Sequence, residues 1–379
     1  MVSVFIDNYG CTANYDNGDI IAGMLVEKEY SIVNDLVDAD VVIVNSCAVK
    51  NVTVNKIIYQ IRQLKKFHSN KKLLITGCMS VSEKERLVEF LGPGVALVST
   101  QNITEIPNVI EKILENEQVV LTNKRKESKL GLPKLNSDKK VASVQIAEGC
   151  LSACTFCSTK IAKGNLVSYP IKDIVHEVEK YTDLGYKRIN LTSTDSACYG
   201  FDINCNLVDL LKEIVKIPGD FNVRIGMGNP KHTIKYFDEL LTVMKNYKIM
   251  KFIHLPLQSG SDKVLDEMKR GHKVEDFIYM ANKLREEIPG ITISTDIIVG
   301  YPTETLEDFQ KTVDVVKLLR FEVVNLSKFA SRTGTYASKI KQLDNHEINR
   351  RSVELTDVYL KIRSEMNPSI ESKNRLVVV

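Results

Sequence analysis

The chain has 379 residues, of which 44% are hydrophobic and 26% charged, and its formal net charge is +3. This composition is ordinary for a folded protein of two or three domains and excludes an intrinsically disordered chain. The first residues, MVSVFIDNYG, lack the basic and apolar segments of a signal peptide, and no apolar run reaches membrane-spanning length. We therefore expect a cytoplasmic protein without membrane contact, whose eight cysteines are reduced and available as ligands.

Short apolar runs alternate with amphipathic stretches over residues 1–121. This alternation predicts an N-terminal domain with an open parallel sheet and helices on its faces. The expected helices are Asp19–Lys28, Val52–Phe67 and Ser82–Phe90, and the expected strands are VSVFID, DVVIVNS, KLLITG and VALVST.

Three cysteines occupy the same place in this pattern. Cys11, Cys47 and Cys78 each follow the carboxyl end of an expected strand, in polar, turn-forming sequence. Because the carboxyl ends of parallel strands share one edge of a sheet, we expect these thiols to converge on a metal site. The alternative is that they are buried as small hydrophobic side chains.

The segment Thr122–Lys140 has seven Lys or Arg residues against two acidic ones and no apolar periodicity. This pattern predicts an exposed basic linker between two domains. A segment that contacts phosphates is the alternative interpretation.

Residues 141–366 show the same alternation on a larger scale. Six β/α units predict a partial (β/α)6 barrel, with active residues at the carboxyl ends of the strands. The fifth unit has a helix start, because Thr305 and Asp308 form a capping box. The expected strands are VASVQIA, RINLTST, FNVRIGM, MKFIHLPL, ITISTDIIVG and FEVVNLSKF.

A second cysteine triplet follows the first of these strands. Cys150, Cys154 and Cys157 have the spacing Cys-x3-Cys-x2-Cys, which suits three corners of a cubane iron–sulfur cluster. Three protein ligands leave one iron open for a small molecule. Radical S-adenosylmethionine (SAM) enzymes use this Cys-x3-Cys-x2-Cys spacing. A zinc site would need a fourth ligand, and the nearest His, His232, lies far downstream. The two remaining cysteines, Cys198 and Cys205, are expected to be packing residues.

The chain closely resembles the radical SAM methylthiotransferases. The segments NYGCTANYDN, VNSCAVK and ITGCMSVSE match the N-terminal signatures of that family. The segments GCLSACTFCSTKIAKGNLVSYP, HLPLQSGSDKVLDEMKRGH, DIIVGYPTET and LSKFASRTGT follow its catalytic domain. The forms GNLVSYP and KFASRTGT are most similar to the archaeal and eukaryotic branch. That branch adds a methylthio group to carbon 2 of threonylcarbamoyladenosine at position 37 of tRNA.

The resemblance implies two 4Fe-4S clusters and SAM as cofactors. Cys150, Cys154 and Cys157 would hold the cluster that cleaves SAM, and Cys11, Cys47 and Cys78 the cluster that carries the sulfur. No catalytic residue is implied beyond the two clusters. The implied SAM contacts are Phe156, Thr194, Asp195, Arg224, Gln258, Gly300 and Glu304.

The implied partners are the anticodon stem-loop of tRNA, an electron donor such as a ferredoxin or flavodoxin, and a sulfur donor. The candidate phosphate contacts are Lys124, Arg125, Lys126, Arg350 and Arg351.

The sequence departs from the family at three places. Ser193-Thr194-Asp195-Ser196 stands where Gly-Gln-Asp-Thr is usual, and Ser152 stands where Gly is usual. Residues 367–379 correspond to only the start of the small C-terminal β-barrel (TRAM) domain of the family. An alternative function is therefore sulfur insertion into a protein side chain or a small or tetrapyrrole cofactor.

Overall fold

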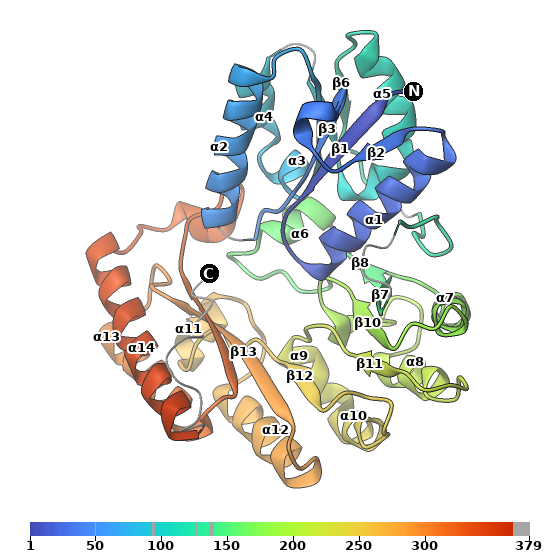
Figure 1. Cartoon of the computed structure of the whole chain (residues 1–379). Helices are drawn as coiled ribbons and strands as arrows, with labels where there is room; N and C mark the ends of the chain where they lie inside the picture. The colour runs from blue at the N-terminus through green and yellow to red at the C-terminus, as the bar shows by residue number, and fades with distance from the viewer. Residues whose placement is uncertain (50, 93–94, 126, 136–139, 367–379) are drawn as a thin grey trace. The chain divides into compact units, whose positions relative to one another are not determined.

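Six parallel strands form the sheet that organises the first part of the chain (Figure 1). The structure is a computed structural model that describes residues 1–379 except 50, 93–94, 126, 136–139 and 367–379. The strand order is β2-β1-β3-β4-β5-β6. The strands are β1 (Ser3–Asn8), β2 (Ser31–Val33), β3 (Val41–Ser46), β4 (Lys72–Gly77), β5 (Ala96–Val98) and β6 (Val119–Leu121).

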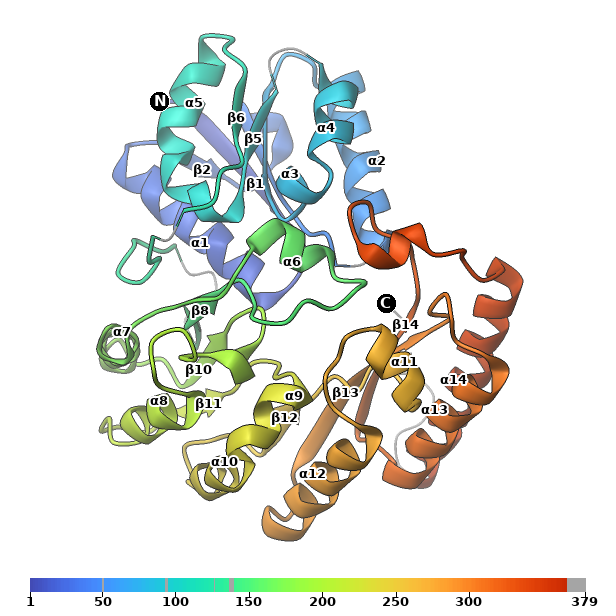
Figure 2. The same cartoon turned by 180° about the vertical axis from the view of Figure 1, so that it is seen from behind.

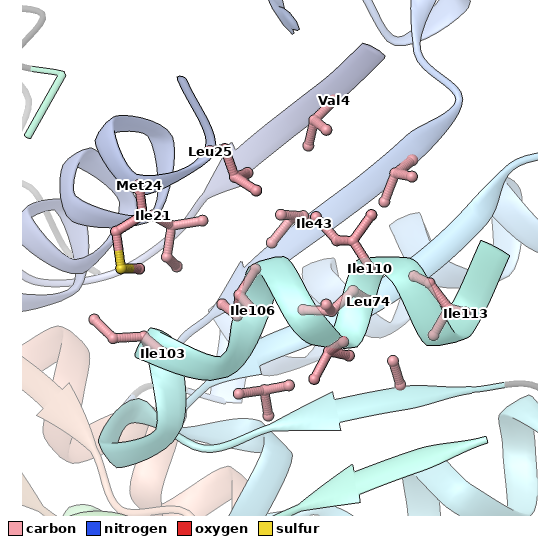
Figure 3. Close-up of a cluster of buried hydrophobic side chains, with 14 of the residues drawn as sticks. Val4, Ile21, Met24, Leu25, Ile43, Leu74, Ile103, Ile106, Ile110 and Ile113 are labelled. Atoms are coloured by element: carbon pink, nitrogen blue, oxygen red, sulfur yellow. The ribbon is translucent and has the colours of Figure 1, made fainter. Parts of the chain in front are cut away.

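Helices cover both faces of this sheet. Helices α1 and α5 pack on one face, where Ile and Leu side chains form a continuous core with residues of β1, β3 and β4 (Figure 3). Helices α2, α3 and α4 pack on the other face. Each fully buried Ile or Leu contributes about 1.5–3 kcal/mol, so these two cores make the sheet a rigid support for the loops at its edge. The helices are α1 (Thr12–Glu27), α2 (Asn51–Phe67), α3 (Met79–Ser82), α4 (Lys84–Leu91) and α5 (Ile106–Leu114), with short 3-10 turns η1 (Leu36–Asp38) and η2 (Thr100–Glu105).

Helix α1 begins seven residues earlier than the sequence predicts. The expected helix was Asp19–Lys28, whereas α1 spans Thr12–Glu27. The early turns are polar, and the side chains of Asn14, Asp16 and Asn17 are buried. Their hydrogen-bond partners lie elsewhere in the chain, so no local apolar pattern marks this part of the helix.

The described chain divides into two compact units whose bounds differ from those of the predicted domains. Unit 1 comprises Met1–Cys150 and Cys157–Thr194, and unit 2 comprises Leu151–Phe156 and Asp195–Val379. The domain boundaries expected at residues 121–122 and 140–141, on either side of the basic segment, stay predictions. Residues 367–379, where the start of a C-terminal barrel was expected, lie outside the described residues.

Unit 1 also contains the start of the second predicted domain. Strands β7 and β10 pair in parallel, and β8 and β9 form a short antiparallel pair around helix α6. Helix α6 packs against α3. The elements are β7 (Val141–Gln145), β8 (Ala147–Glu148), α6 (Ser158–Lys163), β9 (Val167–Ser168), α7 (Ile171–Asp183) and β10 (Arg188–Thr192).

Unit 2 is built around the parallel sheet β12-β13-β14. Helices α13 and α14 pack against each other, and α14 also contacts β14 (Figure 2). All six strands expected for residues 141–366 are present, and the expected α/β fold class is confirmed. The strands of unit 2 are β11 (Asn222–Arg224), β12 (Phe252–His254), β13 (Thr292–Val299) and β14 (Val323–Lys328). The helices are α8 (Leu207–Ile214), α9 (Pro230–Thr233), α10 (Phe237–Met244), α11 (Asp262–Glu267), α12 (Val274–Glu287), α13 (Leu306–Leu319) and α14 (Asn345–Met366), with turns η3 (Ser196–Cys198), η4 (Ile234–Tyr236) and η5 (Tyr336–Lys339).

Candidate functional site

The first cysteine triplet lies at one edge of the unit 1 sheet. Strands β1, β3 and β4 are neighbours, and Cys11, Cys47 and Cys78 follow their carboxyl ends. Cys47 lies so close to Gly10 that a Cβ atom added at Gly10 would be 2.8 Å from its Sγ. Cys78 is within electrostatic range of both Cys47 and Cys11. The structure thus brings the three thiols together, and their role as cluster ligands stays a prediction.

A buried amide network fixes the loops that carry these thiols. The Nδ2 of Asn14 donates to the carbonyl oxygens of Tyr9 at 2.6 Å and Asn45 at 3.1 Å. In return, the Nδ2 of Asn45 donates to the Oδ1 of Asn8 at 2.8 Å and to the Asn14 carbonyl at 2.7 Å. The ends of β1 and β3 and the first turn of α1 are therefore tied together, which holds Cys11 and Cys47 in place.

Glycine is required at Gly10 and Gly77 for two reasons. Gly10 has φ of 111° and Gly77 has φ of 89°, in the left-handed region that favours glycine. A Cβ atom at Gly77 would also collide with the carbonyl oxygen of Ser46. The backbone can therefore turn tightly just before Cys11 and just before Cys78.

The three thiols differ in their exposure and electrostatics. Cys11 is exposed, whereas Cys47 and Cys78 are buried. Burial raises the pKa of the Cys78 thiol to about 12, although the nearby Lys163 opposes this shift. Iron would have to displace the proton, because the thiolate is the metal ligand. The backbone N–H of Val49 points at the Cys47 Sγ at 3.5 Å.

Lys163 is a charged residue of this site that the sequence analysis did not select. It is the last residue of α6, and only 3% of it is exposed. The Nε2 of Gln101 donates to its carbonyl oxygen at 3.0 Å, which fixes the end of the helix. The local sequence KIAKGN gives no sign of this burial, because the contacts come from strand ends distant in sequence.

Two lysines of the basic segment Thr122–Lys140 are buried, although the sequence predicts an exposed linker. The ammonium of Lys129 donates to Glu148 at 2.8 Å and to Asn17 at 3.0 Å, and Lys129 is 4% exposed. The side chain of Lys134 is equally buried, and its ammonium donates to Asp16 at 2.8 Å. The prediction of exposure is wrong for these two lysines, because buried acceptors outside the segment pair with them.

The candidate phosphate contacts of this segment have different surroundings. Lys124 is exposed, whereas Arg125 is half-buried and pairs with Glu105 at 2.8 Å. Lys126 lies outside the described residues.

The second cysteine triplet spans the bounds of the two units. Cys150 and Cys157 belong to unit 1, where the ammonium of Lys160 donates to the Cys150 carbonyl. Gly149 has φ of 71°, and a side chain there would collide with the carbonyl oxygen of Asn165. Cys157 is the N-cap residue of α6, directly before its first residue Ser158.

In unit 2, Cys154 accepts a hydrogen bond from a buried arginine. The Nη1 of Arg270 donates to the Cys154 Sγ at 3.2 Å, and its Nη2 donates to the Pro256 carbonyl at 2.9 Å. Only 6% of Arg270 is exposed. The local sequence around Arg270, MKRGH, gives no sign of this contact.

The neighbours of Cys154 are also held firmly. The backbone N–H of Thr155 donates to the Met268 carbonyl at 3.1 Å, and its carbonyl accepts from Ala337 at 2.9 Å. The hydroxyl of Thr155 lies 2.9 Å from that of Tyr301. Phe156 packs against the apolar cluster that contains Met268 and Tyr301.

Ser152 takes part in a buried polar network of unit 2. Its hydroxyl lies 2.9 Å from the Nε2 of His232 and accepts from the Nδ2 of Asn229 at 3.2 Å. The backbone N–H of Asn229 in turn donates to the Oδ1 of Asp195 at 2.9 Å. Burial lowers the pKa of His232 to about 4, so that the imidazole is neutral at pH 7. Ser152 thus links the cysteine loop to the Asp195 turn.

Three other residues expected to contact SAM differ in the neighbours of their side chains and backbone. Thr194 ends unit 1, and its hydroxyl is buried without a hydrogen-bond partner in the described part of the chain. The guanidinium of Arg224 lies 4.5 Å from the ring centre of Phe252. Gln258 has φ of 74°, and its backbone N–H donates to the Asp296 carbonyl at 2.8 Å.

Glu304 and Arg351 form a buried ion pair. The Nη1 of Arg351 donates to the Oε2 of Glu304 at 2.7 Å, and that oxygen also accepts from the backbone N–H of Gly300 at 2.8 Å. Arg351 is 4% exposed, so the expected surface contact between Arg351 and a phosphate is not supported by its position. The neighbouring Arg350 is exposed and pairs with Glu347 and Glu354. Glu304 therefore fixes the Gly300 turn, with Arg351 as its counter-charge.

Two family models match the chain. Residues 144–316 match the radical SAM superfamily, and residues 3–98 match a family described as uncharacterized protein family UPF0004. No helix among the described residues is long and apolar enough to cross a membrane.

Curated relatives match over the whole chain. A probable threonylcarbamoyladenosine tRNA methylthiotransferase of Pyrococcus horikoshii is 38% identical over 100% of this chain and 89% of its own length. The corresponding protein of Pyrococcus abyssi is 39% identical over the same shares. The threonylcarbamoyladenosine tRNA methylthiotransferase of Homo sapiens is 35% identical over 94% of this chain and 62% of its own length.

Solved structures show the same fold at low identity. The radical S-adenosylmethionine methyltransferase TsrM from Kitasatospora setae, with cobalamin and a [4Fe-4S] cluster bound, superposes with a TM-score of 0.63. It is 16% identical and covers 89% of this chain and 77% of its own. The matches to the relatives, together with two separate cysteine triplets, place this chain in the radical SAM threonylcarbamoyladenosine tRNA methylthiotransferase family.

Proposed function

We propose that this protein adds a methylthio group to carbon 2 of threonylcarbamoyladenosine at position 37 of tRNA. The observation that carries this proposal is the pair of cysteine triplets, each in a loop after a strand, in a chain 38–39% identical to such enzymes over its whole length. An electron-transfer protein needs only one cluster with four protein ligands, whereas two three-thiol sites leave two irons for exogenous ligands.

The family implies SAM and one 4Fe-4S cluster, and Cys150, Cys154 and Cys157 are the residues that we propose hold this cluster. We propose that Cys11, Cys47 and Cys78 hold the second cluster, since three thiols at one sheet edge suit it. When bound, the two groups would supply reductive cleavage of SAM and storage of sulfur. The remaining proposed SAM contacts are Phe156, Thr194, Asp195, Arg224, Gln258 and Gly300, with Glu304 acting through its hydrogen bond to Gly300.

The surface that contacts tRNA is also a proposal. Lys124 and Arg350 are exposed and therefore remain candidates for phosphate contacts, although Arg350 must exchange its carboxylate partners. A ferredoxin or flavodoxin is the class of electron donor that we propose, with a separate sulfur donor, in the cytoplasm, where tRNA and reduced thiols are found.

The proposal is tested by analysing tRNA nucleosides from a strain that lacks the gene. Complementation with the wild-type chain should restore the methylthiolated nucleoside, and Cys47→Ala and Cys154→Ala should not. Purified Cys47→Ala should still release 5′-deoxyadenosine from SAM, whereas Cys154→Ala should release none, because each substitution removes one ligand of one cluster. Cys205→Ala, outside both triplets, is the matched control and should behave as the wild type.

Two results would contradict the proposal. Methylthiolated nucleoside made by Cys47→Ala would remove the sulfur-carrying role from the first triplet. A different result would favour a protein side chain or a small cofactor as the substrate. In that case the purified wild-type chain would cleave SAM, but the tRNA nucleosides would be the same in the strain that lacks the gene and in the complemented strain.

A further inference from the structure

Residues 41–82 contain no acidic side chain. This stretch has seven Lys or Arg residues but no Asp or Glu, whereas the whole chain has 48 Asp or Glu among its 379 residues. It runs from β3 to α3 and contains helix α2, which begins at Asn51, shortly after Cys47. The charged groups of α2 are therefore all basic, and the helix leads directly away from a loop that carries a thiol of the first triplet.

One side of α2 is buried and the other is exposed. The apolar side chains of α2 pack into the core on one face of the unit 1 sheet, where α2 and α4 lie side by side (Figure 1). Side chains three or four positions apart share one face of a helix. At such spacings, four exposed residues form the outward face of α2: Lys56, Tyr59, Arg62 and Lys66.

The three cations of this outward face have no acidic partner. Within the part of the chain that the structure describes, no carboxylate forms an ion pair with Lys56, Arg62 or Lys66. The Nζ of Lys56 lies 5.8 Å from the ring centre of Tyr9, and the guanidinium of Arg62 lies 5.3 Å from that of Phe90. Aromatic rings hold these groups in place but leave their positive charge uncompensated.

Cations on other long helices of the chain are paired. Arg350 of α14 pairs with Glu347 and Glu354, and Lys283 of α12 pairs with Glu287. On α2, by contrast, Arg62 and Lys66 are two like charges four positions apart, an arrangement that destabilises a helix by itself. A polyanionic partner would remove this repulsion.

A nucleic acid is the polyanion that fits this face. Lys56 and Lys66 are separated by about 15 Å along the helix axis, a length over which a nucleic-acid strand presents several phosphates. Tyr59 lies between the cations and is 58% exposed, so its ring is available to stack on an unpaired RNA base. A lipid surface fits less well, because the apolar side of α2 is already packed into the core.

We propose that the outward face of α2 binds the phosphate backbone of the RNA substrate, with Tyr59 against an unpaired base. This inference rests on the proposed function and adds a contact surface to the candidates Lys124 and Arg350. The cations form ion pairs with phosphate oxygens, so no bond is made or broken. Binding there places RNA along the helix that follows Cys47.

The test measures RNA binding by the full-length chain. The α2 variant combines Lys56→Gln, Arg62→Gln and Lys66→Gln, which remove charge but keep side-chain length. Its affinity for a fluorescently labelled anticodon stem-loop RNA is measured by anisotropy between about 50 and 300 mM KCl. Circular dichroism and iron content after anaerobic reconstitution check the fold. A matched control variant loses the same charge at three exposed helix positions of unit 1: Lys112→Gln, Lys172→Gln and Lys180→Gln.

We expect the α2 variant to bind this RNA about 10- to 100-fold more weakly than the wild type at the lowest salt concentration. The slope of log affinity against log salt should become shallower by about three, because each lost phosphate contact removes about one. The control variant should match the wild type. Tyr59→Ala should weaken binding at every salt concentration with an unchanged slope, because stacking is not a charge interaction.

Equal affinity and slope in the α2 variant and the control variant would overturn the inference and leave the proposed function intact. The same variant may instead lose affinity for vesicles of phosphatidylcholine and phosphatidylserine, or lose reduction by a flavodoxin, while RNA binding is unchanged. Either result would overturn the inference in favour of a membrane or an acidic protein. Unchanged RNA affinity in Tyr59→Ala would overturn the stacking contact.

Two further results are decisive. If the α2 variant loses its circular dichroism signal, the single variants Lys56→Gln and Lys66→Gln decide, and a wild-type slope in both would overturn the inference. A wild-type chain that binds no anticodon stem-loop RNA at the lowest salt concentration would refute the proposed tRNA substrate itself.

Discussion

The side chain of Arg270 makes two hydrogen bonds at the second cysteine triplet. One guanidinium nitrogen donates to the Cys154 sulfur and the other to the Pro256 carbonyl, so the planar group is held in a fixed orientation. A hydrogen bond from a cation to a cysteine sulfur stabilises the electron-rich form of a cluster and raises its reduction potential. Arg270 is therefore placed to adjust how readily the cluster that we propose for this triplet accepts an electron.

Replacing Arg270 by Met should lower the midpoint potential of this cluster and slow reductive SAM cleavage by about 10- to 100-fold. The change is measured by potentiometric titration of the cluster and by the rate of 5′-deoxyadenosine release. Arg86→Met, at an exposed position, is the control for the loss of an arginine. A Met variant with reduced SAM cleavage but an unchanged potential would show that Arg270 acts only by supporting the loop.

At the scale of single elements, α1 shows how a helix can be stabilised by polar contacts. Its buried Asp16 pairs with Lys134, and Asn17 accepts hydrogen bonds from Lys129 and Gln145. These contacts join α1 to the basic segment and to β7, more than 100 residues away in sequence. They bring carboxylates of the same helix close to one another in a partly buried setting.

The ionised form of Asp19 is disfavoured by its surroundings in α1. Burial, together with the charge of Asp16, raises the pKa of Asp19 to about 7, and the opposing effect of Lys134 is smaller. Between about pH 4 and pH 7 the folded state therefore binds more protons than the unfolded state, and stability falls as the pH rises. Asp19→Asn should remove this decline and raise the free energy of unfolding at pH 8 by about 1–2 kcal/mol.

Denaturant unfolding of both proteins at pH 5 and pH 8 measures this difference. Asp16→Asn provides the contrast, because it leaves Lys134 buried with a weakened partner and should destabilise the protein at both pH values. Parallel pH profiles for the wild type and Asp19→Asn would refute the assigned pKa shift.

At the scale of the whole chain, the strands and the convergence of Cys11, Cys47 and Cys78 were predictable. Both follow from local pattern, because apolar runs mark the strands and parallel strands present their carboxyl ends at one edge. The edge strands β2 and β6, of three residues each, were missed. The full length of α1 was missed because its first turns are polar.

The cations around the two triplets were not predictable in the same way. Lys163 and Arg270 are defined by partners far away in sequence, and a single Lys or Arg next to a glycine looks like an ordinary surface residue. Arg351 shows the converse, because a basic pair at 350–351 suggests a phosphate contact while the structure buries one member against Glu304. Charge counts along the sequence thus describe composition well but do not separate solvated charges from paired, buried ones.

The two buried lysines of the basic segment have a consequence for proteolysis under native conditions. Trypsin needs an accessible Lys or Arg side chain and a backbone that can extend into its cleft, which favours exposed chain. Within the segment, Lys124 is exposed, whereas the ammonium groups of Lys129 and Lys134 are held by Glu148 and Asp16. Brief digestion followed by mass spectrometry should therefore show cleavage after Lys124 well before cleavage after Lys129 or Lys134. Glu148→Gln should speed cleavage after Lys129, and equal early cleavage at all three lysines of the wild type would contradict their burial.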